Sequence, residues 1–277
     1  MKDINIVIVN YKMKDNIEKC LISLYQDLEG STLDIAIVIV DNASGDNIKE
    51  FLQEKFPKVL CIEQAENCGF GISQNLGMKA VEAKYYFALN PDTQFHVGQK
   101  TLQRLYDFME HNPKVGMIGP KLVYPDGSLQ YSCWRFPPLL QPFYQRTKLG
   151  KTNHGQKRVA FHHMKDFDHN ATRPVDALMG SAMFVRKQAL DTVGGFDERF
   201  FMYYEDIDWS RRMWEAHYPV YYVHDIILTH IHGRGSAKIP GIINALLKNK
   251  LARIHLVSWM KYLWKWRAKN QYYKTLS

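Results

Sequence analysis

Two stretches near the N-terminus, Ile4-Asn5-Ile6-Val7-Ile8-Val9 and Ile35-Ala36-Ile37-Val38-Ile39-Val40, decide the fold class. Both are nearly continuous runs of branched apolar residues, which are typical of strands buried on both faces. Similar runs lie at 59–62 and 84–89, and apolar residues at helical spacing fill the intervals at 15–28, 46–56 and 71–83. This alternation predicts an α/β fold with a Rossmann-like, mostly parallel central sheet flanked by helices.

The second half of the chain is less regular. A turn signal at Tyr124-Pro125-Asp126-Gly127-Ser128 predicts a hairpin. Residues 135–172 are rich in Pro, His, Gly and basic residues with little periodicity, and we interpret them as a long loop. The remaining apolar patterns predict helices at 98–111 and 203–216, a strand at 219–223, and either a strand or a helix at 175–185.

Composition is ordinary for a soluble globular protein, with 46% hydrophobic and 23% charged residues among 277. The four cysteines form no CxxC pair, so we interpret them as reduced thiols of a cytosolic protein. The chain enters a strand-like run directly after Met1, and we therefore expect no signal peptide. No stretch approaches the ~18 apolar residues that a transmembrane helix needs.

The net charge of +8 is concentrated at the C-terminus. Residues 226–277 contain ten of the 36 Lys and Arg and no Asp or Glu. This pattern fits an anionic membrane surface or a nucleic acid, and it fits equally a terminal helix pair packed on the domain with its cations solvated. The same segment carries the aromatic residues Trp259, Tyr262, Trp264, Trp266, Tyr272 and Tyr273.

Polar residues follow the first two predicted strands. Asn10-Tyr11 follows the first, and Asp41-Asn42-Ala43-Ser44-Gly45-Asp46 follows the second. In a parallel sheet, ligands bind beyond the carboxyl ends of the strands, where such an Asp accepts hydrogen bonds from a base or a ribose. The alternative is structural, because Asp41 and Asp46 also suit a turn and a helix cap.

A glycine-containing loop follows the third strand, at Glu66-Asn67-Cys68-Gly69-Phe70-Gly71-Ile72-Ser73-Gln74-Asn75-Leu76-Gly77. A helix is predicted to begin there, and the N-terminus of a helix favours phosphate. The loop matches neither GxGxxG nor GxxxxGK[ST], so neither a Rossmann dehydrogenase nor a P-loop enzyme is supported. Alone, the pattern is also compatible with an ordinary strand-to-helix connection.

The segment Asn90-Pro91-Asp92-Thr93 places a carboxylate at the end of the fourth strand. Asp92 is suited to hold Mg²⁺ or Mn²⁺, with substrate phosphates and water as the other ligands, although a Pro-Asp turn is the alternative. In His230-Ile231-His232-Gly233-Arg234-Gly235-Ser236, alternate histidines on a strand point the same way. One of them is a candidate to complete the metal shell, and an ordinary surface loop is the other interpretation.

A second acidic cluster, Tyr203-Tyr204-Glu205-Asp206-Ile207-Asp208-Trp209, is embedded in aromatic residues. On a helix, Glu205 and Asp208 share a face and Asp206 points elsewhere. Burial among aromatics raises the pKa of a carboxyl group, which suits proton transfer. Capping of the helix is the structural alternative, and we favour a catalytic function.

Taken in order, these motifs resemble the inverting family 2 glycosyltransferases of the GT-A fold, especially rhamnosyltransferase-like enzymes of bacterial surface polysaccharide assembly. The ordered set also includes Gly194-Gly195-Phe196-Asp197-Glu198-Arg199-Phe200-Phe201, and the resemblance covers residues 4–236. It implies a GT-A domain over 1–236, with a nucleotide-sugar half at 1–115 and an acceptor and catalytic half at 116–236. Residues 237–277 are then a basic, aromatic helical extension.

The resemblance also implies roles for individual residues. Asp206, beside Glu205, matches the catalytic base, and Asp92 matches the metal ligand, with His230 or His232 near the metal or the diphosphate. Asn90 stands where the family often has the first Asp of an Asp-x-Asp motif. The acceptor side would include Asp176, Gly180 and Asp208. Donor binding would involve Asn10, Tyr11, Asp41, Asn67, Gly69, Phe70, Gly71, Asn75 and Asn90.

The implied reaction is inverting transfer of a sugar from a nucleoside diphosphate, dTDP-rhamnose first and UDP-hexoses second, to a hydroxyl of a glycan or polyprenyl-linked saccharide. Mg²⁺ or Mn²⁺ would be the cofactor. We expect a cytoplasmic enzyme, peripheral on the inner face of the membrane through its tail, without nucleic acid as a partner. The alternatives are a catalytically inactive relative and a nucleic-acid-binding protein.

Overall fold

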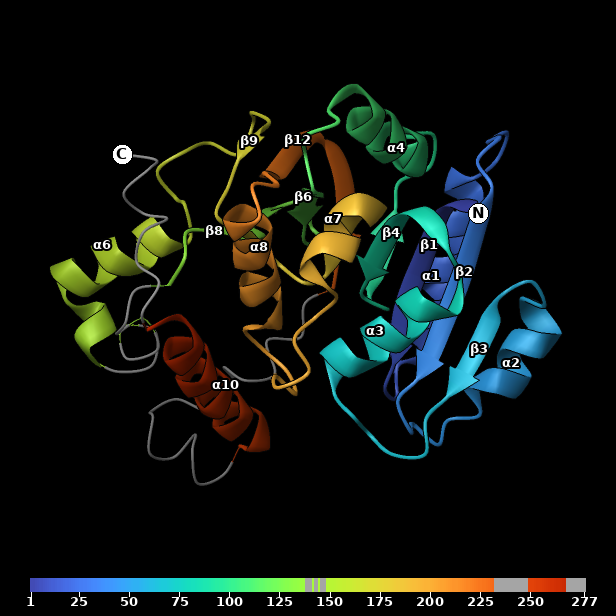
Figure 1. Ribbon diagram of the computed structural model, residues 1–277, viewed down its shortest axis with the longest axis horizontal. Helices are drawn as coiled ribbons and strands as arrows, with labels where there is room; N and C mark the ends of the chain where they lie inside the picture. The colour runs from blue at the N-terminus through green and yellow to red at the C-terminus, as the bar shows by residue number, and fades with distance from the viewer. Residues whose placement is uncertain (138–140, 142–143, 145–147, 232–248, 268–277) are drawn as a thin grey trace.

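The computed structural model describes residues 1–137, 141, 144, 148–231 and 249–267 (Figure 1). His232 and residues 237–248 of the predicted extension lie outside the described residues. Within this part, no helix is long and apolar enough to cross a membrane.

A ten-stranded, mostly parallel sheet forms the centre of the molecule, which confirms the predicted fold class. Its N-terminal part has four parallel neighbours in the order β3-β2-β1-β4. The bounds of these strands are β1 Lys2–Asn10, β2 Ile35–Asp41, β3 Leu60–Glu63 and β4 Ala83–Leu89. Because all four point the same way, the polar residues that follow them gather at one edge of the sheet.

The sheet continues beyond β4 in the order β11-β6-β12-β5, with β11 antiparallel to its neighbours and β12 parallel to β6. These strands are β5 Thr93–Phe95, β6 Met117–Val123, β11 Ala182–Arg186 and β12 Val220–His230. Short strands complete the structure: β7 Leu129–Gln130, β8 Cys133–Trp134, β9 Arg173–Pro174 and β10 Ala177–Leu178. Both predicted halves share one sheet, so their division at residue 115 stays a prediction about function.

Helices cover both faces of the sheet, as the alternation predicts. Along β1, Ile4, Ile6 and Ile8 face one core and Val7 faces the other, because successive side chains of a strand alternate. The first core includes α1 Lys14–Asp27, α2 Ile48–Lys55 and α4 Thr101–His111. The second includes α3 Phe70–Ala80, α7 Lys187–Val193 and α8 Glu205–Glu215, which lie in front of the sheet in Figure 1.

The helix α10, Lys250–Trp266, packs on α8 through a third cluster that includes Ile207, Tyr262 and Trp266. The predicted loop at 135–172 is partly wrong, because it contains the 3₁₀ helix η1 Lys148–Lys151 and the helix α6 Asn153–His162. Polar residues dominate α6, so its pattern lacks the apolar period that marks a helix. The strand predicted at 219–223 also continues to His230.

Candidate active site

The residues that follow β1 and β2 meet at the sheet edge. Asn10 pairs with Asp41 in the parallel register, and the Asn10 amide donates to Asp41 Oδ1 at 2.9 Å and to Asp46 Oδ1 at 3.0 Å. Asn10 and Asp41 are buried, whereas the Tyr11 side chain is 46% exposed. The structure therefore gathers the predicted nucleoside residues in one place, and the partly exposed Tyr11 ring has Lys12 Nζ over it, 5.7 Å from its centroid.

The glycine-containing loop before α3 packs against the chain that leads to α8. Asn67 Oδ1 accepts from Gly69 N–H at 3.0 Å and from the Asn42 amide at 3.1 Å. Gly69 has φ of +91°, and a Cβ there would lie 2.3 Å from the Phe201 carbonyl oxygen. Only glycine fits this position, because the backbone is left-handed and the approach is closer than any side chain permits.

Asn75 connects the same two segments. Its amide oxygen accepts from Phe196 N–H and its amide nitrogen donates to the Phe196 carbonyl, both at 2.8 Å. Gly71 lies against the same residue, since a Cβ there would be 3.0 Å from Phe196 Cβ. Both ends of the Asn75 amide are thus bonded to Phe196, and the donor-binding role of Asn75 stays a prediction.

The loop that begins at Phe196 ends in two left-handed residues, Tyr203 with φ of +70° and Tyr204 with φ of +68°. Such conformations cost about 1–3 kcal/mol each for non-glycine residues and persist where the surroundings impose them. The helix α8 begins directly after them at Glu205, and Asp206 in its first turn contacts Gly180, next to the Ser181 carbonyl that bonds Asn90 at the end of β4. Aromatic neighbours and the Asn75 contact hold this arrangement in place.

Asp206 has the environment of a general base. Its Oδ2 accepts from Gly180 N–H at 3.0 Å and its Oδ1 from Ile207 N–H at 2.8 Å. Burial raises the pKa of Asp206 to about 6, because these bonds only partly offset the loss of hydration. A carboxyl group with this pKa is ionised at neutral pH and more basic than an exposed aspartate. Phe70 borders the same place, with its ring 3.7 Å from the position of a Cβ on Gly180.

Glu205 differs from its neighbour in having a buried Oε2 with no hydrogen-bond partner. Burial, and then the nearby charge of Asp206, raise the pKa of Glu205 well above its ordinary value. Two adjacent buried carboxyl groups do not both ionise readily, so each raises the cost of a negative charge on the other. The pKa of Glu205 is raised the more strongly of the two, because no backbone N–H of another residue offsets its burial as Gly180 and Ile207 do for Asp206.

The other acidic cluster lies where β4 and β12 end. Asp92 Oδ1 is 3.2 Å from His230 Nε2, and the Asn90 amide is 3.4 Å from the same nitrogen. His230 Nδ1 is 2.6 Å from Gln130 Oε1. An amide oxygen only accepts, so Nδ1–H donates a hydrogen bond to Gln130 Oε1, and in the neutral ring the Nε2 lone pair lies on the side of Asn90 and Asp92.

This donor set fits a divalent cation. A ligating histidine usually donates its other ring N–H to an oxygen, as His230 does to Gln130, and a carboxylate is the natural second ligand. The part of the chain that the structure describes contains no group of three or more His, Cys, Asp or Glu side chains that could hold a metal ion. Asp92 and His230 would therefore supply two ligands, leaving the rest to phosphate oxygens and water. The structure places His230 beside Asp92, whereas His232 lies outside the described residues.

One short segment brings the two acidic clusters together. Gly180 N–H holds Asp206, and the carbonyl of the next residue, Ser181, accepts from Asn90 N–H at 2.8 Å. A substrate between Asp92 and Asp206 would therefore lie over Gly180 and Ser181, the two residues that directly precede β11. Of the predicted acceptor-side residues, Gly180 is in this position.

The other two predicted acceptor-side residues face elsewhere. Asp176 Oδ2 accepts from Phe136 N–H at 2.9 Å, and burial raises its pKa. Asp208 is fully buried, and its carboxylate contacts Lys265 Nζ at 2.7 Å, Arg212 Nε at 2.9 Å and Trp266 Nε1 at 2.9 Å. The Asp208 carboxylate connects α8 to α10, and its acceptor-side role stays a prediction.

Sequence reasoning assigned no role to Asn42 and Gln130. Asn42 is buried, and its Oδ1 accepts from Cys68 N–H at 2.9 Å, which fixes the loop before α3. The position of Asn42 directly after Asp41 is the feature of the sequence that could have indicated this role. Gln130 orients His230 from a distant hairpin strand, and no local pattern pairs these two residues.

Solved structures with a similar fold define the class of protein. TarS 1–349 of S. aureus in complex with UDP aligns with a TM-score of 0.55 at 15% identity, over 83% of this chain and 60% of that one. GalNAc-T7 with UDP, GalNAc and Mn²⁺ aligns with a TM-score of 0.59 at 13% identity, over 89% of this chain and 48% of that one. This chain therefore has the GT-A fold of these glycosyltransferases.

Residues 5–191 match the family model described as Glycosyl transferase family 2, and the chain belongs to that family. It is 29% identical over 254 residues to the N-acetylglucosaminyl-diphospho-decaprenol L-rhamnosyltransferase of Mycobacterium tuberculosis (strain CDC 1551 / Oshkosh), covering 85% of this chain and 78% of that protein. The dTDP-rhamnosyl transferase RfbF of Shigella flexneri is 25% identical over 211 residues, which cover 74% of this chain and 63% of that protein. These matches support sugar transfer in glycan synthesis as the activity.

Proposed function

We propose that this chain is an inverting glycosyltransferase that moves a sugar, rhamnose first and a hexose second, from a nucleoside diphosphate to an acceptor hydroxyl. The observation that carries the proposal is Asp206, a buried carboxylate with a raised pKa, oriented by Gly180 N–H beside the Asp92 cluster. The names of the rhamnosyl-transferring relatives support the choice of dTDP-rhamnose as the first donor.

The chemistry needs one base and no protein nucleophile. Asp206 takes the proton of the acceptor hydroxyl while the hydroxyl oxygen bonds to the anomeric carbon. The bond between that carbon and the diphosphate breaks on the opposite face of the sugar. The electron pair leaves with the nucleoside diphosphate, and the configuration inverts. Because the pKa of Glu205 is raised more strongly than that of Asp206, we assign the negative charge of the pair to Asp206.

We assign the nucleoside to the edge formed by Asn10, Tyr11 and Asp41. The exposed Tyr11 ring is placed to stack on a base, and the Asp41 carboxylate to accept from a base or ribose. Asn67, Gly69, Phe70 and Gly71 shape the wall between this edge and Asp206.

We assign Mg²⁺ or Mn²⁺ to Asp92 and His230, with Asn90 beside them. When bound, the cation neutralises charge on the departing diphosphate. The residues of this chain orient the site: Gln130 holds the imidazole, and the Asp92 carbonyl accepts from Ile231 N–H at 2.9 Å, which fixes the end of β12.

We place the reaction at the inner face of the membrane, with a saccharide on a lipid diphosphate as the acceptor. One relative's name specifies a diphospho-decaprenol acceptor. The exposed side of α10 is basic and apolar without an acid, as an anionic lipid surface requires. Its residues are Lys250, Arg253, Val257, Met260, Lys261, Trp264 and Arg267.

Ligand-dependent stabilisation and transfer assays test this function. The full chain is melted with dTDP, UDP, GDP and their sugars, each with and without Mg²⁺ or Mn²⁺, because a ligand that binds the folded state raises its stability. The donor selected is then incubated with saccharide acceptors, and the anomeric configuration of the product is read by NMR. A metal-dependent shift followed by an inverted linkage supports the proposal.

Other outcomes favour the alternatives. Nucleotide binding without transfer to any saccharide would indicate an inactive relative. Salt-sensitive binding of RNA, without any response to sugar nucleotides, would indicate that the basic residues of 226–277 serve a nucleic acid.

A further inference from the structure

The helix α10 holds the main chain of residues 197–208, the segment that leads into α8, by two side-chain hydrogen bonds. Ser258 Oγ donates to the Met202 carbonyl at 2.8 Å. One turn further along the helix, Lys261 Nζ donates to the Arg199 carbonyl at 2.7 Å. Both bonds end on backbone atoms, so they fix the path of the chain.

The same helix packs on the two left-handed tyrosines of this segment. The centroid of the His255 ring lies 5.1 Å from that of Tyr203 and 5.3 Å from that of Tyr204. The Tyr262 ring lies 5.4 Å from the Tyr204 ring. Left-handed backbone is unfavourable for tyrosine and persists where the surroundings impose it. The rings of α10 are part of those surroundings.

Ion pairs join α10 to both ends of the segment. Lys265 Nζ lies 2.6 Å from Asp197 Oδ2 and 2.7 Å from Asp208 Oδ1. The Trp266 indole N–H donates to the same Asp208 oxygen at 2.9 Å. The helix therefore spans the segment from its first residue to the first turn of α8.

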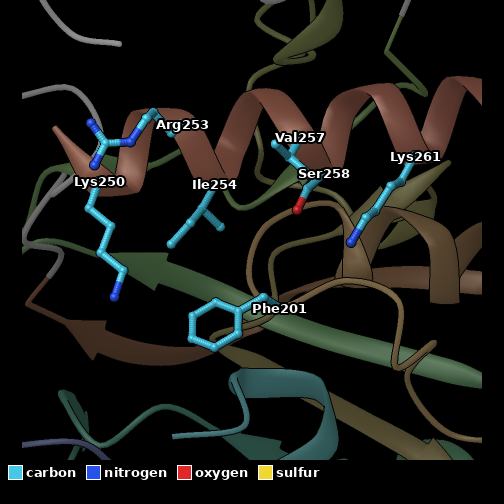
Figure 2. A pocket seen from close by; sticks show the side chains of 7 residues that line it. All are labelled: Phe201, Lys250, Arg253, Ile254, Val257, Ser258 and Lys261. Atoms are coloured by element: carbon cyan, nitrogen blue, oxygen red, sulfur yellow. The ribbon is translucent and has the colours of Figure 1, made fainter. Parts of the chain in front are cut away.

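A cavity of about 350 Å³ lies beside the two main-chain contacts. Figure 2 shows Ser258 and Lys261 extending from α10 toward the side where the Phe201 ring lies. Ile254 and Val257 border the same cavity from the helix. Side chains that line a cavity lack packing partners on that side, so the two hydrogen bonds carry much of the contact here.

The segment held by α10 contains Asp206, which accepts from Gly180 N–H at 3.0 Å. A base acts only within hydrogen-bond reach of the proton it takes, and a displacement of about 1 Å costs on the order of 10²-fold in rate. Residues 197–208 and α10 both follow residues 5–191, which match the family model.

We propose that α10 is a positioning element of the active site, and that Ser258 and Lys261 are positioning residues that hold Asp206 where it reaches the acceptor hydroxyl. The proposal rests on the proposed function, because it takes Asp206 as the base. Both residues act through the main chain of 197–208. Weakening their bonds therefore lowers kcat and leaves donor binding intact.

The double variant Ser258→Ala and Lys261→Met of the full chain tests the proposal. It removes both hydrogen bonds and keeps most of the volume of each side chain. With a water-soluble saccharide acceptor, kcat is expected to fall at least about tenfold while the KM for the donor stays within about twofold. Amide hydrogen exchange in 197–208 is expected to become at least about tenfold faster, because the segment opens locally more often.

A rescue variant and a control separate positioning from a general loss of stability. The double variant Ser258→Ala and Lys261→Arg keeps a donor on α10 and is expected to recover most of kcat. Lys55→Met is the matched control, because this lysine bonds Glu18 at 2.6 Å on the other face of the sheet. It is expected to keep wild-type kcat and wild-type exchange in 197–208. Each variant is also melted and titrated with the nucleotide that stabilises the wild type.

The outcomes distinguish this inference from the proposed function. Wild-type kcat in the double variant with Met overturns the positioning role, whether or not exchange becomes faster, and the proposed function then stands. A fall of kcat that the Arg variant does not recover, or that comes with an equal loss of nucleotide affinity, overturns it as well. Absence of sugar transfer by the wild type overturns both.

Discussion

Asn75 and Phe196 are joined by two hydrogen bonds of 2.8 Å, one to the Phe196 N–H and one to its carbonyl. This pair connects α3, which follows the glycine-containing loop, to the segment that ends at Glu205 and Asp206. A Cβ on Gly195 would lie 2.2 Å from Asn75 Oδ1, so the neighbouring glycine is required for the contact. The glycine-containing motif and the motif that begins at Gly194 therefore form one structural unit that positions Asp206, the proposed base.

Replacing Asn75 by Ala is expected to lower the free energy of unfolding by about 2–3 kcal/mol, because the buried peptide groups of Phe196 lose their partners. Turnover falls with it, since the segment carrying Asp206 loosens, whereas the affinity for the donor nucleotide changes little. Thermal melts, kinetics and nucleotide titration measure these effects. Lys79→Ala, an exposed change on the same helix, is the control. Loss of nucleotide affinity with unchanged stability would support the donor-binding role.

The pH dependence of activity follows from Asp206. Because burial raises its pKa to about 6, kcat/KM is expected to rise as the pH increases through that value and the carboxylate forms. A profile measured between roughly pH 4.5 and pH 8 checks this. An acid limb near the ordinary pKa of 3.8 would show that burial does not act on the base as described.

The same shift affects stability with the opposite trend. Because the folded pKa of Asp206 exceeds the unfolded value, the folded protein holds more protons between roughly pH 4 and pH 6. The contribution of Asp206 to the free energy of unfolding therefore falls as the pH rises across this window, by roughly 3 kcal/mol. Denaturant unfolding of the wild type and Asp206→Asn at both ends of this window measures the difference. Because the charge of Asp206 also raises the pKa of Glu205, the difference reports the titration of the pair. An equal change of stability with pH in both proteins would contradict the raised pKa of Asp206.

Metal-dependent nucleotide binding tests the cluster at the ends of β4 and β12. Asp92→Ala and His230→Ala are expected to abolish the additional thermal stabilisation that Mn²⁺ gives with nucleotide. Gln130→Leu is expected to weaken the Mn²⁺ response by about 10–100-fold, because it removes the acceptor that orients the imidazole. His96→Ala is the control histidine, since its ring contacts Thr229 instead. An unchanged Mn²⁺ response in Asp92→Ala would remove this carboxylate from the metal site.

The buried pair of Asp208 and Lys265 anchors α10. Asp208→Asn is expected to destabilise the protein by about 3 kcal/mol, because Lys265 and Arg212 lose a buried carboxylate partner. Limited proteolysis is expected to cut before α10 faster in this variant than in Arg267→Ala, which changes an exposed cation of the same helix. Equal cleavage rates and equal melting temperatures would show that α10 is held without this pair.

The sheet was predictable because buried parallel strands are nearly pure runs of Val and Ile, and their polar ends follow directly in the sequence. This pattern predicts that Asn10, Asp41 and Asp92 follow the strands at one edge of the sheet, as the structure shows. The contact of Asp208 with α10 was not predictable, because helical spacing shows which residues share a face but not what covers that face. Gln130 was missed because its partner lies on a strand distant in sequence.

Turnover by Asp206→Asn, measured together with donor affinity, tests whether Asp206 is the catalytic base. The amide keeps the shape of the side chain but takes no proton, so turnover is expected to fall by at least ~10²-fold while the donor dissociation constant is preserved. Glu215→Gln, at the far end of α8, serves as the control and is expected to keep wild-type turnover. Near-normal turnover by Asp206→Asn would contradict the assignment of this carboxylate as the base.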